Sequence, residues 1–144
     1  MGVDRVRGAL VLWILSAGAV AALDRSDLEQ QGYRAVECLF TERCVIDTPC
    51  ERAWRESRWF LNDATGIAYR EFEDGRLRRG HLFLDRRWEK RSEARQIVMP
   101  MEEAVASHLT IFDGGGAIYA LQYWANPGSG QFFRGQCKTT LEES

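Results

Sequence analysis

Apolar and polar residues alternate with a period of two in a series of short runs along this chain. The first run places Val36, Cys38 and Phe40 on one face. Alternation of this kind is typical of β-strands that bury one face. The runs that follow, rich in aromatic and β-branched residues, cover 52–61, 67–72, 77–84, 95–99, 108–112, 117–124 and 131–137.

Turn-forming residues separate these runs, at 62–63, 74–75, 113–116 and 126–130. Short strand candidates spaced by about a dozen residues predict an antiparallel meander. A meander of this size tends to close, because open strand edges invite aggregation. We therefore predict a mainly β fold, with about eight strands closing into a small, flattened barrel.

Two segments depart from the strand pattern. The polar segment 23–32 is a short helix or a loose leader that ends at Gly32. The segment 100–106 begins with a proline followed by acidic residues, which is a helix-start pattern, so it is a helical candidate.

The first 22 residues have the features of a secretory signal peptide. Arg5 and Arg7 supply the positive flank, 8–15 is apolar, and 16–22 is rich in the small residues that cleavage needs. The apolar stretch is shorter than the ~20 residues of a membrane span, which disfavours the alternative of an uncleaved anchor. We expect an exported protein, periplasmic or secreted, with one domain over 23–144 and no stable membrane span after cleavage.

The four cysteines all follow this leader, at Cys38, Cys44, Cys50 and Cys137. An even number of cysteines in a small exported domain predicts two disulfides, with three connectivities open. The spacing matches no zinc template. We favour Cys44–Cys50 across the turn-like 45–49, and Cys38–Cys137 tying the first strand to the last. Such an end-to-end bridge agrees with barrel closure.

The cysteine spacing, with Gly135-Gln136-Cys137 after a glycine-rich hairpin, resembles small exported bacterial disulfide-bonded β proteins of unknown function. A second similarity is to the periplasmic inhibitors of c-type lysozyme, which are disulfide-bonded eight-strand barrels with Ser-Gly-x-x-Tyr in their inhibitory loop. Thr65, Gly66 and Tyr69 match that motif, with Thr in place of Ser. The family's downstream Lys is absent, so Arg78 or Arg79 would stand in. The resemblance implies a partner-binding loop over 62–69.

Composition excludes some functions. The chain has 19 basic and 21 acidic residues and a net charge of −2, which argues against a nucleic-acid binder. His81 and His108, the only histidines, lack metal-ligand spacing, and Ser129 is not in a G-x-S-x-G motif. We predict no catalytic residue, no cofactor and no metal.

Aromatic residues are the remaining candidates for binding. Trp88 lies in the charged run 85–95, and Tyr123 and Trp124 adjoin a turn, so these three join the loop residues as candidate partner-binding positions. The other aromatics either fill the barrel or line a small cavity. We favour an exported, non-catalytic binding protein for a small apolar ligand or a protein partner. The alternatives are an inhibitor of a cell-wall hydrolase and a hydrolase with an unrecognised site.

Overall fold

The computed structural model describes residues 23–87, 92–102, 105–123 and 130–139. The predicted signal peptide, 1–22, lies outside the described residues, as do Trp88 and Trp124. The elements are α1 (Arg25–Gln30), β1 (Arg34–Val45), β2 (Glu51–Asn62), β3 (Ile67–Glu71), β4 (Leu77–Arg87), β5 (Ser92–Glu102), β6 (Val105–Phe112), β7 (Gly116–Tyr123) and β8 (Gly130–Thr139).

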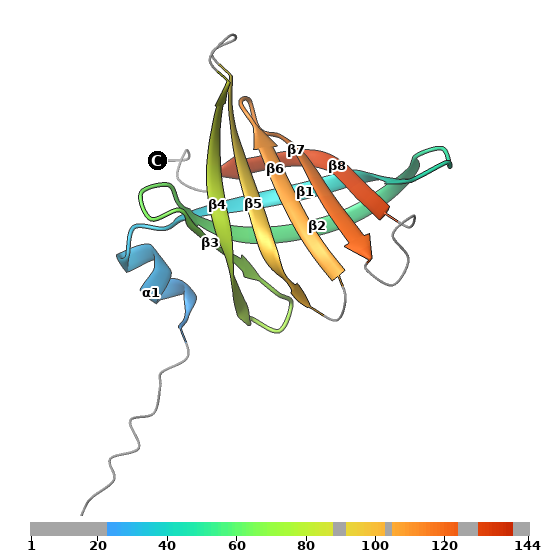
Figure 1. Cartoon of the computed structure of the whole chain (residues 1–144). Coiled ribbons are helices and arrows are strands. Elements are labelled where there is room, and N and C mark those ends of the chain that lie inside the picture. Colours follow the sequence, from blue (N-terminus) through green and yellow to red (C-terminus); the bar gives the residue numbers. More distant parts are fainter. Residues whose placement is uncertain (1–22, 88–91, 103–104, 124–129, 140–144) are drawn as a thin grey trace, which may run out of the picture.

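The strands of the described chain form one closed barrel (Figure 1). Each strand pairs antiparallel with the next, and β8 pairs with β1 to complete the wall. The predicted eight-strand antiparallel barrel is thus confirmed. Closure removes the two sheet edges that an open meander would leave exposed.

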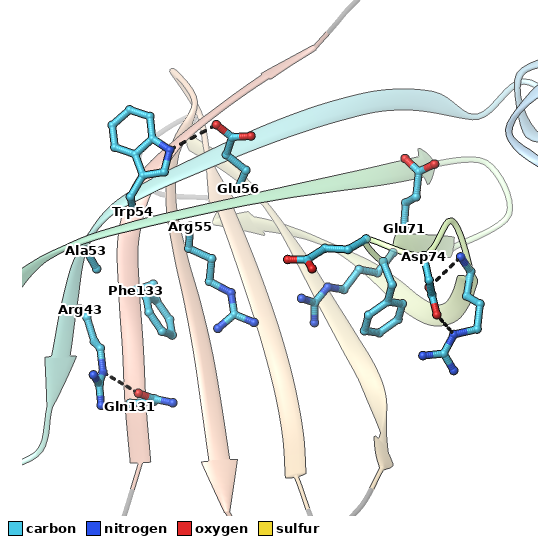
Figure 2. Close-up of a pocket in the computed structure, with 13 residues that line it drawn as sticks. Arg43, Ala53, Trp54, Arg55, Glu56, Glu71, Asp74, Gln131 and Phe133 are labelled. Carbon is cyan, nitrogen blue, oxygen red and sulfur yellow. Dashed lines mark hydrogen bonds and ion pairs between the residues drawn. The ribbon is translucent and has the colours of Figure 1, made fainter.

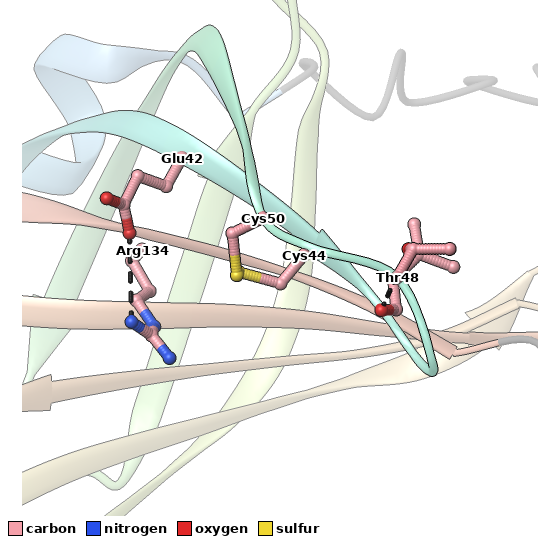
Figure 3. Close-up of a disulfide and its surroundings, with 6 residues drawn as sticks. Glu42, Cys44, Thr48, Cys50 and Arg134 are labelled. Carbon is pink, nitrogen blue, oxygen red and sulfur yellow. Dashed lines mark hydrogen bonds and ion pairs between the residues drawn. A yellow bond between two sulfur atoms is a disulfide. The ribbon is translucent and has the colours of Figure 1, made fainter.

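Both favoured disulfides are confirmed. Cys38 and Cys137 are register partners on β1 and β8, so their bridge crosses the seam where the barrel closes. Cys44–Cys50 spans the loop between β1 and β2 (Figure 3). In that loop Thr48 donates hydrogen bonds from its backbone N–H and its hydroxyl to the carbonyl of Val45.

The alternating residues of each strand meet inside the barrel and fill its centre. Trp59 and Tyr119 are 0% and 1% exposed, and their ring centroids lie 6.0 Å apart. Phe40 lies 5.8 Å from Tyr119 and 6.5 Å from Phe133. The rest of this core is aliphatic and small: Val36, Cys38, Leu61, Ala68, Leu82, Ile97, Met99, Leu109, Ile111, Ala117 and Cys137.

A second, smaller cluster lies on the outer face of the barrel beneath α1. Leu28 of the helix packs with Tyr33 and Phe60, and all three are buried. The helix begins with a capping box, in which Asp24 and Asp27 each accept a hydrogen bond from the other's backbone N–H. One face of β2 therefore packs into the barrel, and α1 covers the opposite face at Phe60.

β1 carries an irregularity that needs a glycine on its neighbour. The register of β1 shifts between Phe40 and Glu42 against both β2 and β8, which marks a β-bulge. Gly135 lies opposite Phe40, where an added Cβ would be 2.0 Å from the carbonyl oxygen of Leu39. A side chain at this position would force the two strands apart.

The helical expectation for 100–106 is wrong. Residues up to Glu102 continue β5, and β6 begins at Val105. The β5–β6 register is irregular between Met99 and Glu102, and a strand tolerates Pro100 at such a point because the residue needs no ladder N–H there. β4 pairs with β5 only as far as Val98, so the pairing that accompanies the extended backbone here is that of Glu102 with Val105 on β6.

Candidate ligand-binding site at one end of the barrel

The two ends of the barrel differ in how their internal charges are matched. At the end near the β2–β3 turn, Asp63 pairs with Arg34 at 2.6 Å and with Arg95 at 3.0 Å. Burial by itself would raise the pKa of Asp63, but the hydrogen bond and charge of Arg95, then those of Arg34, outweigh it and lower that pKa. At this end one carboxylate thus joins two arginines, and both arginines also line a second hollow of about 800 Å³.

At the other end the wall of the barrel has an opening. β2 pairs with β1 as far as Glu51, but it pairs with β3 only from Asn62 to Arg58. Past Arg58, the free stretch of β2 faces the β3–β4 turn. A hollow of about 1170 Å³ lies between them (Figure 2), and it is lined by Arg43, Ala53, Trp54, Arg55, Glu56, Arg70, Glu71, Phe72, Glu73, Asp74, Arg76, Gln131 and Phe133.

Two arginines reach into this hollow from the inner face of the barrel. Arg55 is the register partner of inward-facing Phe40, and Arg70 is the partner of inward-facing Trp59, so the pleat directs both side chains inward. In Figure 2 Arg55 and Phe133 lie on one side of the β2 ribbon and Trp54 lies on the other.

Aromatic rings hold both guanidinium groups. The Cζ of Arg55 is 4.9 Å from the ring centroid of Phe133 and 5.2 Å from that of Tyr119. The Cζ of Arg70 is also 5.2 Å from the Tyr119 centroid and is 4.7 Å from that of Phe72. Cations at these distances are attracted by the electron-rich ring faces. Aromatic contact thus takes the place that a carboxylate has beside most arginines.

Hydrogen bonding leaves Arg70 only partly satisfied. Its Nη1 donates to the hydroxyl of Tyr119 at 2.6 Å, but its buried Nε has no hydrogen-bond partner among the described residues. The pKa of Arg70 is lowered, first by burial and then by the charges of Arg55 and Arg78, although Tyr119 acts in the opposite direction. The lining as a whole holds four arginines and four acidic residues, and its positive charge is concentrated on the inner face at Arg55 and Arg70.

The acidic residues around the hollow are mostly engaged at its rim. Glu71 accepts from Arg25 at 3.0 Å and from Arg58 at 3.3 Å, and Asp74 pairs with Arg76. Trp54, 72% exposed, donates to Glu56 at 3.3 Å.

The far wall of the hollow is formed by a chain of hydrogen-bonded polar side chains. Arg43 donates to Gln131 at 2.8 Å and pairs with Glu51, and Gln131 donates to the hydroxyl of Tyr123 at 2.6 Å. Tyr123, one of the predicted binding residues, is thereby tied to the lining of this site.

The structure places the other predicted loop residues elsewhere. Thr65 is exposed in the β2–β3 turn, where Asn62 accepts from the Thr65 backbone N–H and Gly66 adopts a φ of +66°. Tyr69 lies on the outer face of β3, with its ring 5.5 Å from that of Tyr33 in the cluster under α1. The hollow and the predicted loop are thus separate places on the molecule.

The two candidate stand-ins for the family's lysine point in opposite directions. Arg79 is the register partner of Tyr69 and is exposed on the outer face. Arg78 is the partner of Arg70 on the inner face, and it donates to the carbonyl of Pro100.

Sequence reasoning missed Arg55 and Arg70. Their signal was present in the alternation: each lies on the face that carries Trp59 or Ala68, where a charged side chain is out of pattern. Such a residue becomes informative only when the register shows that it points into a barrel.

The histidines lie outside this region. His81 is exposed on β4, and His108 faces outward on β6 with its pKa lowered by burial. Within the described ranges, no three His, Cys, Asp or Glu residues gather as a metal site would require. Nor does any helix among these residues have the length and apolar character needed to cross a bilayer.

Comparison of the chain with family models, with curated proteins and with solved structures found no significant match.

Proposed function

We propose that this protein is an exported, non-catalytic binding protein that holds a small ligand in the hollow at the open end of its barrel. The observation that carries the proposal is the lining of the hollow: inward-facing arginines lie on aromatic rings beside an opening in the wall. The lining combines three aromatic residues with nine charged or polar ones, so it offers ring faces and polar groups to one ligand. The volume of about 1170 Å³, part of it open to solvent, is sufficient for a compound of metabolite size.

Two disulfides support the exported location, because such bonds persist in oxidising compartments. The closed wall supports a binding role, because a barrel holds its lining side chains in fixed positions at little conformational cost on binding.

A thermal-unfolding screen tests this proposal. The purified protein is heated with a panel of neutral, cationic and anionic small compounds, each with an apolar body. We expect at least one compound to raise the Tm, because a ligand that binds only the folded state stabilises it.

Ala53→Trp supplies the blocking variant, since Ala53 lines the hollow and a bulky side chain there would occupy it. Ala64→Trp is the matched control, because Ala64 is exposed in the β2–β3 turn at the other end. The proposal fails if no compound shifts the Tm, or if the shift survives Ala53→Trp.

A second candidate is inhibition of a cell-wall hydrolase through the 62–69 turn. Its support is the preorganised backbone: Gly66 donates to the Asn62 carbonyl at 3.1 Å and accepts from the N–H of Leu82 at 2.9 Å. Rigid loops bind with little ordering cost. The half-buried position of Tyr69 weighs against it, because an inhibitory side chain must be free to enter its target.

Titration against c-type lysozyme, with cell-wall lysis as the readout, separates the two candidates. We expect no inhibition at micromolar protein. Nanomolar inhibition that is lost in Tyr69→Ala, with the variant still folded, would reverse the ranking.

A further inference from the structure

We infer that the ligand is anionic, with a carboxylate or phosphate group on an apolar body, and that Arg55 and Arg70 bind that group. The inference rests on the proposed function, since it specifies the chemical class of ligand for the same hollow.

The first argument is the contrast with the other arginines. Ion pairs with carboxylates are made by Arg25, Arg34, Arg43, Arg58, Arg76, Arg95 and Arg134. In the part of the chain that the structure describes, neither Arg55 nor Arg70 makes one; Arg52 and Arg79 make none either, but they are exposed to water, whereas Arg55 and Arg70 face inward. A cation withdrawn from water without a counter-charge is costly, and an anionic ligand would supply the missing charge.

The second argument is the geometry of the two groups. Each guanidinium carbon is 5.2 Å from the centroid of the Tyr119 ring, so the two lie within about 10 Å of each other. Arg55 lines the hollow and makes no hydrogen bond among the described residues, so its N–H donors are available to a ligand. Guanidinium forks bind the oxygens of carboxylate and phosphate with paired N–H donors, and such charge-assisted bonds are the strongest that side chains make.

The third argument concerns the body of the ligand. The rings of Phe72 and Phe133 line the hollow beside the arginines. An apolar or aromatic body against these rings would be removed from water while the anionic group lies deeper, against Arg70. The site therefore suits an amphiphilic anion better than a free inorganic ion.

Isothermal titration calorimetry of the purified protein tests the inference with octanoate, octyl phosphate and 1-octanol. The three probes share one apolar chain and differ in the head group. We expect at least one anion to bind tenfold or more tightly than 1-octanol, with an affinity that falls as ionic strength rises. Whichever anion binds more tightly identifies the head group as carboxylate or phosphate.

Arg55→Gln and Arg70→Gln should each weaken binding of that anion at least tenfold and leave the affinity for 1-octanol unchanged. Arg134→Gln is the matched control, because Arg134 is exposed and pairs with Glu42 outside the hollow (Figure 3). Circular dichroism checks that each variant is folded. If Arg70→Gln does not fold, Arg55→Gln decides, since Arg55 makes no hydrogen bond among the described residues.

Equal affinity for the anions and 1-octanol, or anion binding that is unaffected by Arg55→Gln, would overturn the inference and leave the proposed function standing. Failure of both anions to bind would also overturn it. The proposed function itself is tested by the thermal-unfolding screen of neutral, cationic and anionic compounds, with Ala53→Trp as the blocking variant.

Discussion

Two arginines of this barrel, Arg58 and Arg70, illustrate opposite environments. Arg58, on the outer face, lies between Glu37 and Glu71, and its pKa is raised chiefly by the hydrogen bond to Glu37. Arg70, on the inner face, has aromatic rings and the Tyr119 hydroxyl in place of carboxylates, and burial lowers its pKa. The first environment stabilises the charged form, and the second makes the ligand-free fold less stable than it could be.

That difference predicts a higher free energy of unfolding when the Arg70 charge and its hydrogen-bond acceptor, the Tyr119 hydroxyl, are removed together. The double variant Arg70→Met/Tyr119→Phe should match or exceed the parent in free energy of unfolding, by up to about 1–2 kcal/mol, because it removes both a buried cation and its polar partner. Tyr119→Phe alone should lose about 1–3 kcal/mol, since it leaves Arg70 with no acceptor. Urea unfolding of the parent, the single variant and the double variant measures this. A double variant less stable than Tyr119→Phe would contradict the argument.

Asp63 makes the opposite end of the barrel sensitive to acid. Its folded-state pKa is below the ordinary value of 3.8, so its ionised form stabilises the fold above about pH 4, and this stability is lost as the pH falls through the folded pKa. Asp63→Asn should lose about 1–3 kcal/mol at pH 7, since Arg34 and Arg95 lose their shared acceptor. It should also show a shallower fall in stability between pH 5 and about pH 2. Equal slopes for the parent and the variant in urea titrations would exclude this role.

At the scale of elements, the site exists because neighbouring strands differ in length. β2 has 12 residues and β3 has 5. The N-terminal part of β2 therefore extends past β3 and leaves the wall open beside the β3–β4 turn. The same strand is covered on its outer face by α1, through Leu28 and Phe60. One long strand therefore contributes Phe60 to the packing of the helix and Ala53, Arg55 and Glu56 to the lining of the hollow.

The packing of α1 predicts a structural role for Tyr69. Tyr69→Ala should lower the free energy of unfolding by about 2–4 kcal/mol, because it removes a ring from the cluster beneath the helix. Thr65→Ala, in the exposed turn nearby, should stay within about 0.5 kcal/mol of the parent. Chemical denaturation of both variants measures the difference. A Tyr69→Ala protein as stable as the parent would leave that side chain available for partner binding.

At the scale of the whole molecule, closure of the barrel and the Cys38–Cys137 bridge act on the same seam. The bridge joins residues 99 apart in sequence on β1 and β8, whereas Cys44–Cys50 closes a loop of 6. In the chain-entropy model, a cross-link stabilises more when it closes a longer loop, because it restricts the unfolded chain more strongly.

Removing each disulfide separately should therefore lower the free energy of unfolding by unequal amounts. Cys38→Ala/Cys137→Ala should cost about 4 kcal/mol or more, and Cys44→Ala/Cys50→Ala about 2 kcal/mol. Thermal and urea unfolding of the two double variants, under conditions that keep the other disulfide intact, give the comparison. A larger loss for the short loop would show that native-state contacts, rather than chain entropy, decide the contribution of these bonds.

The sequence by itself determined the strands, most of the turns and both disulfides. Alternation with a period of two, as in Val36, Cys38 and Phe40, is a local signal, and barrel closure brought the two distant cysteines together as predicted. It also misled locally at Pro100, where β5 continues to Glu102 in spite of a helix-start pattern.

Only the tertiary structure decided where the candidate site lies. Arg55 and Arg70 interrupt the faces that carry Trp59 and Ala68, but the alternation does not show that the two arginines come together at one opening of a barrel. The register of β2 against β1 and β3 turns both inward, and the early end of β3 opens the wall beside them. Register and strand length relative to a neighbour are set by pairing between strands across the sheet. Residue type and spacing along the chain therefore could not predict the position of this site.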